Sequence, residues 1–316
     1  MNNIGSEIMI DRASREPSSA YVVYAKGMPD AIENARLLCK KIFCMDHTAK
    51  DGCINCRKFD DGNMLDFLEI GGEDIIKIGE VRTIHEFLIN SSFSRGARCI
   101  HIKGANKLTV QSQNYLLKTL EEPPKDVVFV LSTDNKQALL ETVRSRCIEI
   151  EISQIPRAKL QEILREHGCD EEKSRVISGL AHGSKAMAME MMEDQGLFQI
   201  REDAAAFLSE LTSRKRSFVE MQKMMQKNQE RLIDMLYHLG SMCMDAVIYS
   251  EKNKDSIINA DMEELINSIS LGFTTAYLNR IISIINERIE LKSRNPQLRN
   301  DLFIESIIFD LMEVKA

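Results

Sequence analysis

The first half of the chain combines two periodicities of apolar residues. Short apolar runs predict β-strands at residues 21–24, 67–70, 99–102, 127–131 and 148–152. Apolar residues at helical spacing predict helices at residues 31–43, 78–89, 109–122 and 139–144. Thr109 can cap the third of these helices, and Pro123 and Pro124 prevent it from continuing. Strands that alternate with helices predict an α/β fold, in which a parallel sheet is covered by helices on both faces.

The pattern changes near residue 153, where the strand-like runs end. Short helical segments follow, punctuated by Gly179 and Gly183, and long helical segments fill the chain from about residue 196. We therefore predict three parts, which are an α/β domain over residues 1–153, a small helical domain over residues 154–195 and an all-α domain over residues 196–316.

Composition and charge narrow the classes of function. Apolar residues make up 44% of the 316 positions, as expected for a globular protein with a buried core. The net charge of −7 argues against a chain that binds nucleic acid by itself, because such binding relies on Lys and Arg. No segment approaches the roughly 20 apolar residues of a membrane span, and the N-terminus lacks the pattern of a signal peptide. We therefore expect a cytoplasmic protein with no membrane partner.

A cytoplasmic location makes the eight cysteines candidates for free thiols or metal ligands rather than disulfides. Cys44, His47, Cys53 and Cys56 form the pattern C-x2-H-x5-C-x2-C in the segment CMDHTAKDGCINC. Four thiolate or imidazole ligands this close in sequence are sufficient for a tetrahedral structural zinc site. The alternative is a reduced loop without metal. The remaining cysteines on predicted helices and strands are expected in the core, and they are Cys39, Cys99, Cys169 and Cys243.

Residues 20–35, AYVVYAKGMPDAIENA, have the layout of strand, turn and helix that builds a phosphate-binding loop. The Gly-Lys-[Ser/Thr] ending that binds phosphates and Mg²⁺ is missing. The segment therefore keeps the scaffold of a phosphate site without its chemistry.

Three stretches in order, LLKTLEEPP (116–124), VVFVLSTDN (127–135) and VRSRC (143–147), closely resemble the clamp-loader subunits of bacterial DNA polymerase III. Those subunits are AAA+ proteins related to the replication factor C subunits. The resemblance covers nearly the whole chain, strongly over residues 75–150 and weakly in the C-terminal third. It implies an α/β AAA+ core, a small helical lid domain over residues 154–195 and an all-α collar domain over residues 196–316.

The resemblance also implies which branch of the family is closest. The ATPase subunits need a working phosphate loop, whereas the delta prime branch in many bacteria lacks one. Against the family pattern, Ala31 takes the lysine position and Ile32 the hydroxyl position, and Asp30 adds negative charge beside them. Lys103 and Gly104 take the acidic positions that follow the third strand. A chain of this kind is expected to bind no ATP and to be no enzyme on its own.

In that family the arginine of the SRC motif projects into the ATP site of the neighbouring subunit. Here the motif is Ser145, Arg146 and Cys147. A guanidinium is permanently charged and can stabilise charge that develops on the γ-phosphate, so the resemblance implies that Arg146 is an arginine finger in trans. The alternative is an arginine that caps a helix or pairs with a carboxylate. Glu121 and Glu122 adjoin each other on a helix end and cannot face each other as a catalytic pair.

The delta prime branch carries a four-cysteine zinc loop at the place of the cysteine segment. Cys44, Cys53 and Cys56 align with three of its ligands, Lys50 replaces the remaining one, and His47 is the candidate substitute.

The resemblance implies a non-catalytic delta prime subunit that joins the ATPase (gamma/tau) subunits and a delta subunit in a hetero-pentameric ring. That ring, part of the DNA polymerase III holoenzyme, loads the sliding clamp on primed DNA. One alternative is an ATP-hydrolysing clamp-loader subunit with an unconventional nucleotide site. A zinc-dependent nucleic-acid-binding module outside any ring is a third possibility, but the acidic charge and the SRC motif argue against it.

Overall fold

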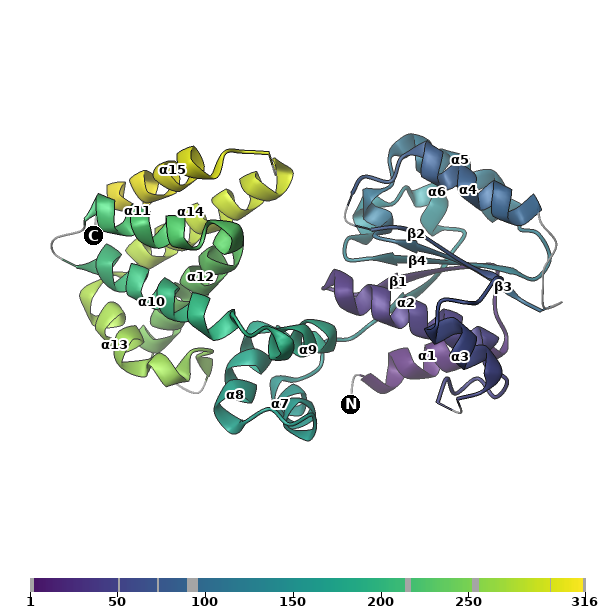
Figure 1. Cartoon of the computed structure of the whole chain (residues 1–316), viewed down its shortest axis with the longest axis horizontal. Helices are drawn as coiled ribbons and strands as arrows, with labels where there is room; N and C mark the ends of the chain where they lie inside the picture. The colour runs from purple at the N-terminus through teal and green to yellow at the C-terminus, as the bar shows by residue number, and fades with distance from the viewer. Residues whose placement is uncertain are drawn as a thin grey trace. The chain divides into compact units, whose positions relative to one another are not determined.

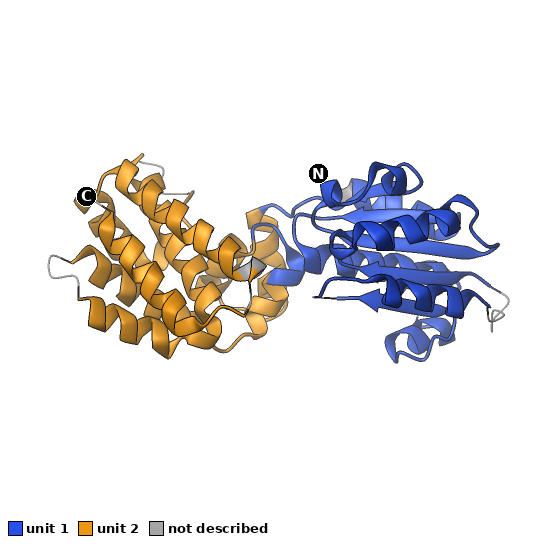
Figure 2. Ribbon diagram, turned by 90° about the horizontal axis from the view of Figure 1, so that it is seen from above, with its two compact units in different colours: residues 1–156, 182–187 blue, residues 157–181, 188–316 orange. Residues whose placement is uncertain are grey.

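The computed structural model describes residues 3–50, 52–72, 74–89, 96–213, 217–251, 256–295 and 297–314. The chain forms two compact units, the first of residues 1–156 and 182–187 and the second of residues 157–181 and 188–316 (Figure 2). The division into three domains, with boundaries after residues 153 and 195, is a finer division than these two units, and it stays a prediction. None of the described helices combines the length and the apolar composition that crossing a membrane requires.

The first unit is built on a five-stranded sheet in which the strands run parallel in the order β2-β3-β4-β1-β5. The strands are β1 (Ala20–Tyr24), β2 (Phe67–Gly71), β3 (Arg98–Lys103), β4 (Val127–Thr133) and β5 (Ile148–Glu151). Each lies on a run that the sequence predicts as a strand, so these predictions are confirmed. The strand β1 lies between β4 and β5, away from its sequence neighbour β2. The carboxyl ends of the parallel strands share one edge, where open α/β sheets bind ligands.

Helices cover both faces of this sheet, with α1, α2 and α3 on one face and α4, α5 and α6 on the other (Figure 1). Their bounds are α1 (Asn3–Arg15), α2 (Met28–Phe43), α3 (Ile54–Asp60), α4 (Ile78–Ile89), α5 (Val110–Glu121) and α6 (Glu141–Arg144), with 3-10 turns η1 (Ala105–Lys107) and η2 (Lys136–Ala138). Alternate residues of a strand enter opposite cores. Tyr21 and Val23 share a core with Leu38 of α2, whereas Val22 shares one with Leu116 of α5. The predicted burial of both faces is confirmed.

Local signals locate the ends of α5 correctly. Thr109 Oγ1 accepts a hydrogen bond from the backbone N–H of Ser112 at 3.1 Å, which caps the helix as predicted. The helix ends at Glu121, two residues before Pro123.

Two helices lie where the sequence pattern predicts none. The helix α1 has a sparse apolar face, of which Ile10 and Ala13 are buried. The helix α3 begins inside the cysteine segment, where the ligand spacing suggests only a loop. Its Phe59 ring lies 6.1 Å from Phe43 and 4.7 Å from Phe67, centroid to centroid, so contacts distant in sequence stabilise it.

The second unit is helical, as the sequence beyond residue 153 predicts. Its helices are α7 (Arg157–Glu166), α8 (Glu171–Leu180), α9 (Lys185–Glu193), α10 (Leu197–Thr212), α11 (Phe218–Lys227), α12 (Leu232–Ser250), α13 (Glu263–Gly272), α14 (Thr275–Arg294) and α15 (Asn300–Glu313), with 3-10 turns η3 (Gln229–Arg231) and η5 (Ala260–Met262). The first residues of α9 belong to the first unit. Helices α10 to α15 share one apolar core (Figure 1). Cys243 lies in it as predicted, but Cys169 is only half-buried after α7.

A buried polar network fixes the segment of residues 257–261 in this unit. The guanidinium of Arg201 on α10 donates to Asn259 Oδ1 at 2.8 Å and pairs with Asp261 at 2.5 Å. Asp245 on α12 accepts hydrogen bonds from the backbone N–H and the side-chain amide of Asn259, at 2.7 and 2.8 Å. These groups satisfy one another, which burial demands of charged side chains.

Residues 257–261 also contact helices α7 and α8 and fix them in place. Arg157, the first residue of α7, donates to the carbonyl oxygen of Ile257 at 2.9 Å. Gly179 of α8 packs so closely that an added Cβ would lie 2.7 Å from Ile258 Cγ2. Helices α7 and α8 are therefore joined to α10 and α12 through residues 257–261.

Candidate functional site

The segment of residues 20–35 folds as β1, a turn at residues 25–27 and α2, which is the layout that the sequence predicts. Gly27 is the N-cap of α2, and its carbonyl oxygen accepts a hydrogen bond from the N–H of Ala31 at 3.2 Å. Ala31 is fully buried and Ile32 is half-buried. Both positions therefore pack as apolar residues, and neither offers a charge or a metal-binding oxygen.

Asp30 lies over this turn. A Cβ built on Gly27 would be 3.6 Å from Asp30 Oδ2 and 3.8 Å from Ser184 Oγ. The other oxygen, Asp30 Oδ1, accepts a hydrogen bond from the backbone N–H of Ala186 at 3.1 Å. The carboxylate is thus anchored beside the turn, and its negative charge repels an anion brought to the N-terminus of α2.

The turn that follows β3 is built around Gly104. Gly104 has a φ of 66°, a conformation that disfavours residues with a Cβ. A Cβ there would lie 3.2 Å from the carbonyl oxygen of Gly72 and 3.8 Å from Met28 Cε. A glutamate at this position would therefore meet both backbone strain and close neighbours.

A polar network surrounds Glu69 in the middle of β2. Its carboxylate pairs with Arg36 of α2 at 2.6 Å, with Lys103 at 3.1 Å and with His101 Nδ1 at 3.0 Å. Burial disfavours the carboxylate, but hydrogen bonds from His101 and Lys103 and the charge of Arg36 outweigh it and lower the pKa of Glu69 to about 2. Lys103 thus neutralises a carboxylate of the neighbouring strand.

Glu69, His101 and Ser132 follow one another across β2, β3 and β4, with His101 Nε2 3.0 Å from Ser132 Oγ. Burial lowers the pKa of His101, so in the neutral ring Nδ1–H donates to Glu69 and Nε2 accepts from Ser132. The order resembles a hydrolase triad, but His101 and Ser132 are fully buried, so no substrate reaches them. Sequence reasoning missed this network, although Glu69 and His101 are polar residues at matching central positions of two apolar strands.

The SRC motif lies in the turn between α6 and β5. Val143 is fully buried and Cys147 packs against the same core, which anchors the turn. Burial, with the charge of Glu149, raises the pKa of Cys147 to about 12, so it stays a thiol. Ser145 Oγ and Arg146 Nη1 both donate to the carbonyl oxygen of Thr142, at 3.2 and 2.7 Å. Arg146 points outward, with 34% of its side chain exposed.

The LLKTLEEPP and SRC stretches meet through one ion pair. Arg146 Nη2 lies 2.5 Å from Glu121 Oε1, and the Glu121 side chain is 48% exposed. Sequence reasoning placed Glu121 at a helix end and gave it no partner. The pairing of Arg146 with a carboxylate is the alternative that the sequence left open, but it uses only part of the guanidinium, which carries five N–H donors.

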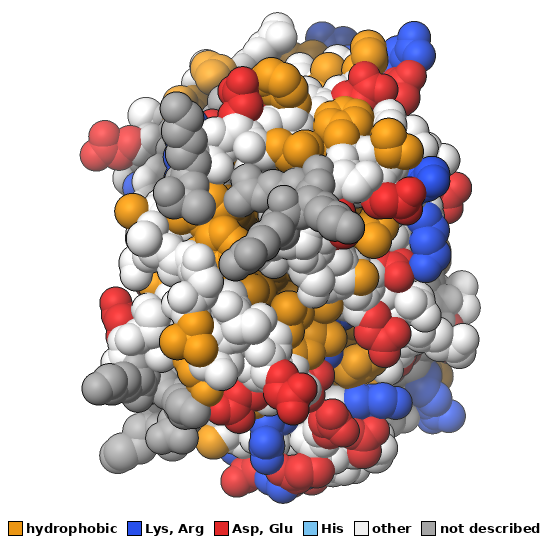
Figure 3. Space-filling model, turned by 90° about the vertical axis from the view of Figure 1, so that its left-hand side faces the viewer, with side chains coloured by type: hydrophobic (Ala, Val, Ile, Leu, Met, Phe, Trp, Pro, Cys, Tyr) orange, Lys and Arg blue, Asp and Glu red, His pale blue; other side chains and the backbone are white. Residues whose placement is uncertain are grey.

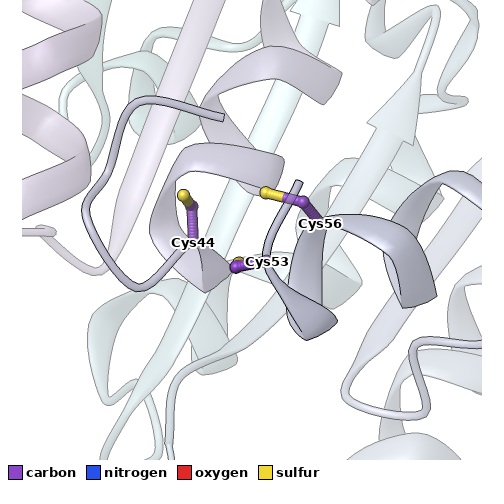
Figure 4. Close-up of side chains that lie close together, drawn as sticks. All are labelled: Cys44, Cys53 and Cys56. Carbon is purple, nitrogen blue, oxygen red and sulfur yellow. The ribbon is translucent and has the colours of Figure 1, made fainter. Parts of the chain in front are cut away.

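The structure brings three of the four predicted metal ligands together. The sulfur atoms of Cys44, Cys53 and Cys56 all lie within 4.8 Å of one another. Cys44 follows the last turn of α2, and Cys53 and Cys56 lie at the start of α3 (Figure 4). Hydrogen bonds to Cys53, from the backbone N–H of Met45 first and then from Cys56 and Asn55, outweigh burial and lower its pKa.

His47 lies in the same loop but outside this cluster. Its Nδ1 is 3.0 Å from the carbonyl oxygen of Lys41, and its φ of 61° marks a tight turn. When Nδ1–H donates to that carbonyl, Nε2 is left deprotonated and able to bind a metal. Lys50, at the position of the remaining family cysteine, is exposed.

Zinc fits the chemistry of the cluster. Zinc–thiolate bonds of about 2.3 Å place the sulfurs of a tetrahedral site about 3.8 Å apart. The sulfur atoms here lie within 4.8 Å of one another, so a small contraction would complete three corners. The fourth corner would require His47 Nε2 to move toward the cysteines, or a water molecule.

Comparison with known proteins places the chain in a family. A family model described as DNA polymerase III, delta subunit, matches residues 6–156, and one described as DNA polymerase III, delta subunit, C terminal, matches residues 195–313. The DNA polymerase III subunit delta prime of Bacillus subtilis is 25% identical over 87% of this chain and 86% of its own length. The DNA polymerase III subunit gamma of Buchnera aphidicola is 33% identical over 50% of this chain and 46% of its own length.

A solved structure shares the fold. It is a DNA polymerase III gamma subunit-related protein from Thermotoga maritima, with a TM-score of 0.57, 18% identity and coverage of 99% of this chain and 100% of that chain. This likeness agrees with the predicted fold class, an α/β core with a parallel sheet followed by an all-helical region.

The Glu69 network predicts a pH-dependent contribution to stability. The carboxyl has a folded pKa of about 2 against its ordinary 4.5, so its stabilisation is present above pH 4.5 and is lost as the pH falls toward 2. We expect Glu69→Gln to lower the free energy of unfolding by about 3 kcal/mol at neutral pH. The difference from the wild type should shrink as the pH falls through this range, as measured by urea unfolding followed by circular dichroism.

The control for this experiment is Glu33→Gln, which removes an exposed carboxylate from α2 and should change little at any pH. A destabilisation by Glu69→Gln that stays constant down to about pH 2 would show that the carboxylate charge is not responsible.

Proposed function

Because this chain belongs to the DNA polymerase III delta subunit family, we propose that it is a non-catalytic clamp-loader subunit of the delta prime type. In this proposal it occupies one place in a hetero-pentameric ring with ATPase subunits of the gamma/tau type and a delta subunit. The ring opens the sliding clamp and places it on primed DNA in the cytoplasm. The observation that carries the proposal is the outward-facing Arg146 of the SRC motif, which is held by a hydrogen bond to the carbonyl oxygen of Thr142. It occurs in a chain whose own phosphate loop lacks phosphate-binding side chains.

We propose that this chain binds no ATP. Productive binding needs a lysine on the phosphates, a hydroxyl on Mg²⁺ and acidic residues after the third strand. Those places hold Ala31, Ile32, Lys103 and Gly104. Asp30 adds a carboxylate beside Gly27, and Lys103 is engaged with Glu69. The departures lie on separate elements, and together they remove the phosphate-binding lysine, the hydroxyl on Mg²⁺ and the acidic residues that productive binding needs.

We propose that Arg146 acts on the ATP of the adjoining subunit. The Arg146 side chain is partly exposed in the turn between α6 and β5, and its charge is permanent. An arginine supplied in trans makes hydrolysis depend on correct packing of two subunits. In this arrangement Ser145 and Cys147 shape and anchor the turn, while Arg146 alone reaches the phosphate.

The helices beyond residue 196 are proposed to form this chain's part of the collar that joins the ring. Several large apolar side chains of that region are exposed, among them Leu271, Leu302 and Phe309. One side of the unit carries patches of apolar side chains among Asp and Glu (Figure 3). Apolar surface of this kind is typical of protein interfaces.

We propose a structural zinc ion held by Cys44, Cys53 and Cys56, with His47 as the fourth ligand. Bound zinc would hold the end of α2 against the start of α3 and would supply no reaction chemistry. The support is the convergence of three thiols from two elements and the backbone partner of His47 Nδ1.

Titration calorimetry with ATP tests the proposed loss of nucleotide binding. We expect no saturable binding by the isolated chain below about 1 mM, because the phosphates would find neither lysine nor Mg²⁺ ligand. The ATPase subunit of the same organism is the positive control. Saturable binding would instead favour the alternative of an ATP-hydrolysing subunit with an unconventional site.

Substitution of Arg146 tests the trans role. In a complex reconstituted with the host's ATPase and delta subunits, Arg146→Ala should assemble normally and lower DNA-stimulated ATP hydrolysis. We expect a partial loss, of up to about twofold in total rate, because only one site of the ring depends on this chain. The matched control is Arg144→Ala, since Arg144 is bound to Glu149 at 2.8 Å. Unchanged hydrolysis by an assembled Arg146→Ala complex contradicts the assignment.

Elemental analysis tests the zinc site. We expect about one zinc per chain in protein purified without chelator, and its loss on combined Cys53→Ser and Cys56→Ser substitution. Cys169→Ser, outside the cluster, should leave the zinc content unchanged. Native protein that carries no zinc after purification from zinc-containing medium would refute the site.

A further inference from the structure

The guanidinium of Arg146 is held by partners from two helices. Nη1 donates to the carbonyl oxygen of Thr142 in α6 at 2.7 Å, and Nη2 donates to Glu121 Oε1 at the end of α5 at 2.5 Å. One partner belongs to the local turn, whereas the other comes from 25 residues earlier in the chain. Two fixed points orient a planar group, which one hydrogen bond cannot do.

Both partners of the Arg146 guanidinium, Glu121 and Thr142, are fixed through helix α5. Glu121 is the last residue of α5, and Pro123 beyond it prevents the helix from extending or shifting its end. The segment before α6 is tied to α5 by the buried Gln113, which donates to the carbonyl oxygen of Ala138 at 3.1 Å and accepts from the N–H of Leu140 at 2.7 Å. The helix α5 therefore sets the position of the turn and of the guanidinium together.

The pair orients Arg146 without withdrawing it. The side chains of Arg146 and Glu121 are 34% and 48% exposed, so their attraction is weakened by water and can coexist with a second acceptor. Two of the five guanidinium donors are engaged, which leaves others for phosphate oxygens. A free arginine would have to lose much more rotamer freedom on reaching the same geometry.

We propose that Glu121 is a positioning residue, which holds the Arg146 guanidinium ready for the phosphate of the adjoining subunit's ATP. This role rests on the proposed function of Arg146 in trans. Because misplacement of a catalytic group is costly, loss of Glu121 lowers the hydrolysis rate although Glu121 itself touches no substrate. The stabilisation is realised in the transition state, so kcat falls while KM for ATP does not rise.

A double-mutant cycle in the reconstituted complex tests this role through DNA-stimulated ATP hydrolysis. We expect Glu121→Ala to lower kcat by a factor approaching that of Arg146→Ala, with KM changed by less than about twofold. Glu121→Gln keeps a neutral acceptor and should retain more activity than Glu121→Ala. In the Arg146→Ala background, Glu121→Ala should have no further effect, because the group that it positions is gone. Glu122→Ala, at the exposed neighbouring position, is the matched control and should hydrolyse ATP like the wild type.

Three other outcomes would each overturn the positioning role of Glu121. If Glu121→Ala slows the Arg146→Ala complex as much as it slows the wild type, Glu121 acts elsewhere and the positioning role is overturned. If Glu121→Ala speeds hydrolysis, the ion pair restrains Arg146, and the role is again overturned while the trans function stands. If Arg146→Ala leaves hydrolysis unchanged, the trans function fails and the positioning role falls with it.

Discussion

The first unit depends on covering both faces of a parallel sheet. The central strands β1, β3 and β4 are buried on both faces, which requires helices on both, and α2 supplies much of one of these covers. Leu38 and Cys39 of α2 are fully buried against the strands, and Ala31 is buried at the start of the helix. The strand, turn and helix of residues 20–43 are therefore required for folding, whether or not a phosphate binds there.

That requirement is compatible with our proposal that the segment binds no phosphate. Ala31 is fully buried and completes the packing at the start of α2. The charge of Lys103 is compensated by Glu69, which also pairs with Arg36 and His101. A charge that is removed from water needs partners, so these four residues depend on one another.

The sequence predicts best those features that depend on neighbouring residues. The strand β4 follows from its run of β-branched and aromatic residues, and the cap at Thr109 follows from one side chain and its helix. The helix α3 could not be predicted, because Phe59 is held by rings distant in sequence. The spacing of Cys44, Cys53 and Cys56 revealed them as a group, whereas His47 as the fourth ligand stays a prediction. The partner of Arg146 depends on how α5 and α6 pack, which no local pattern records.

The attachment of α7 and α8 has a consequence for how such chains can be recombined. Arg157 and Gly179 rely on residues 257–258, which lie between α12 and α13, much later in the chain. A hybrid of two related subunits that is joined at residue 195 would combine α7 and α8 from one parent with residues 257–258 from the other. A junction at residue 156 leaves that contact within one parent. Exchange of modules between subunits of this architecture is therefore constrained by one arginine, one glycine and two consecutive isoleucines.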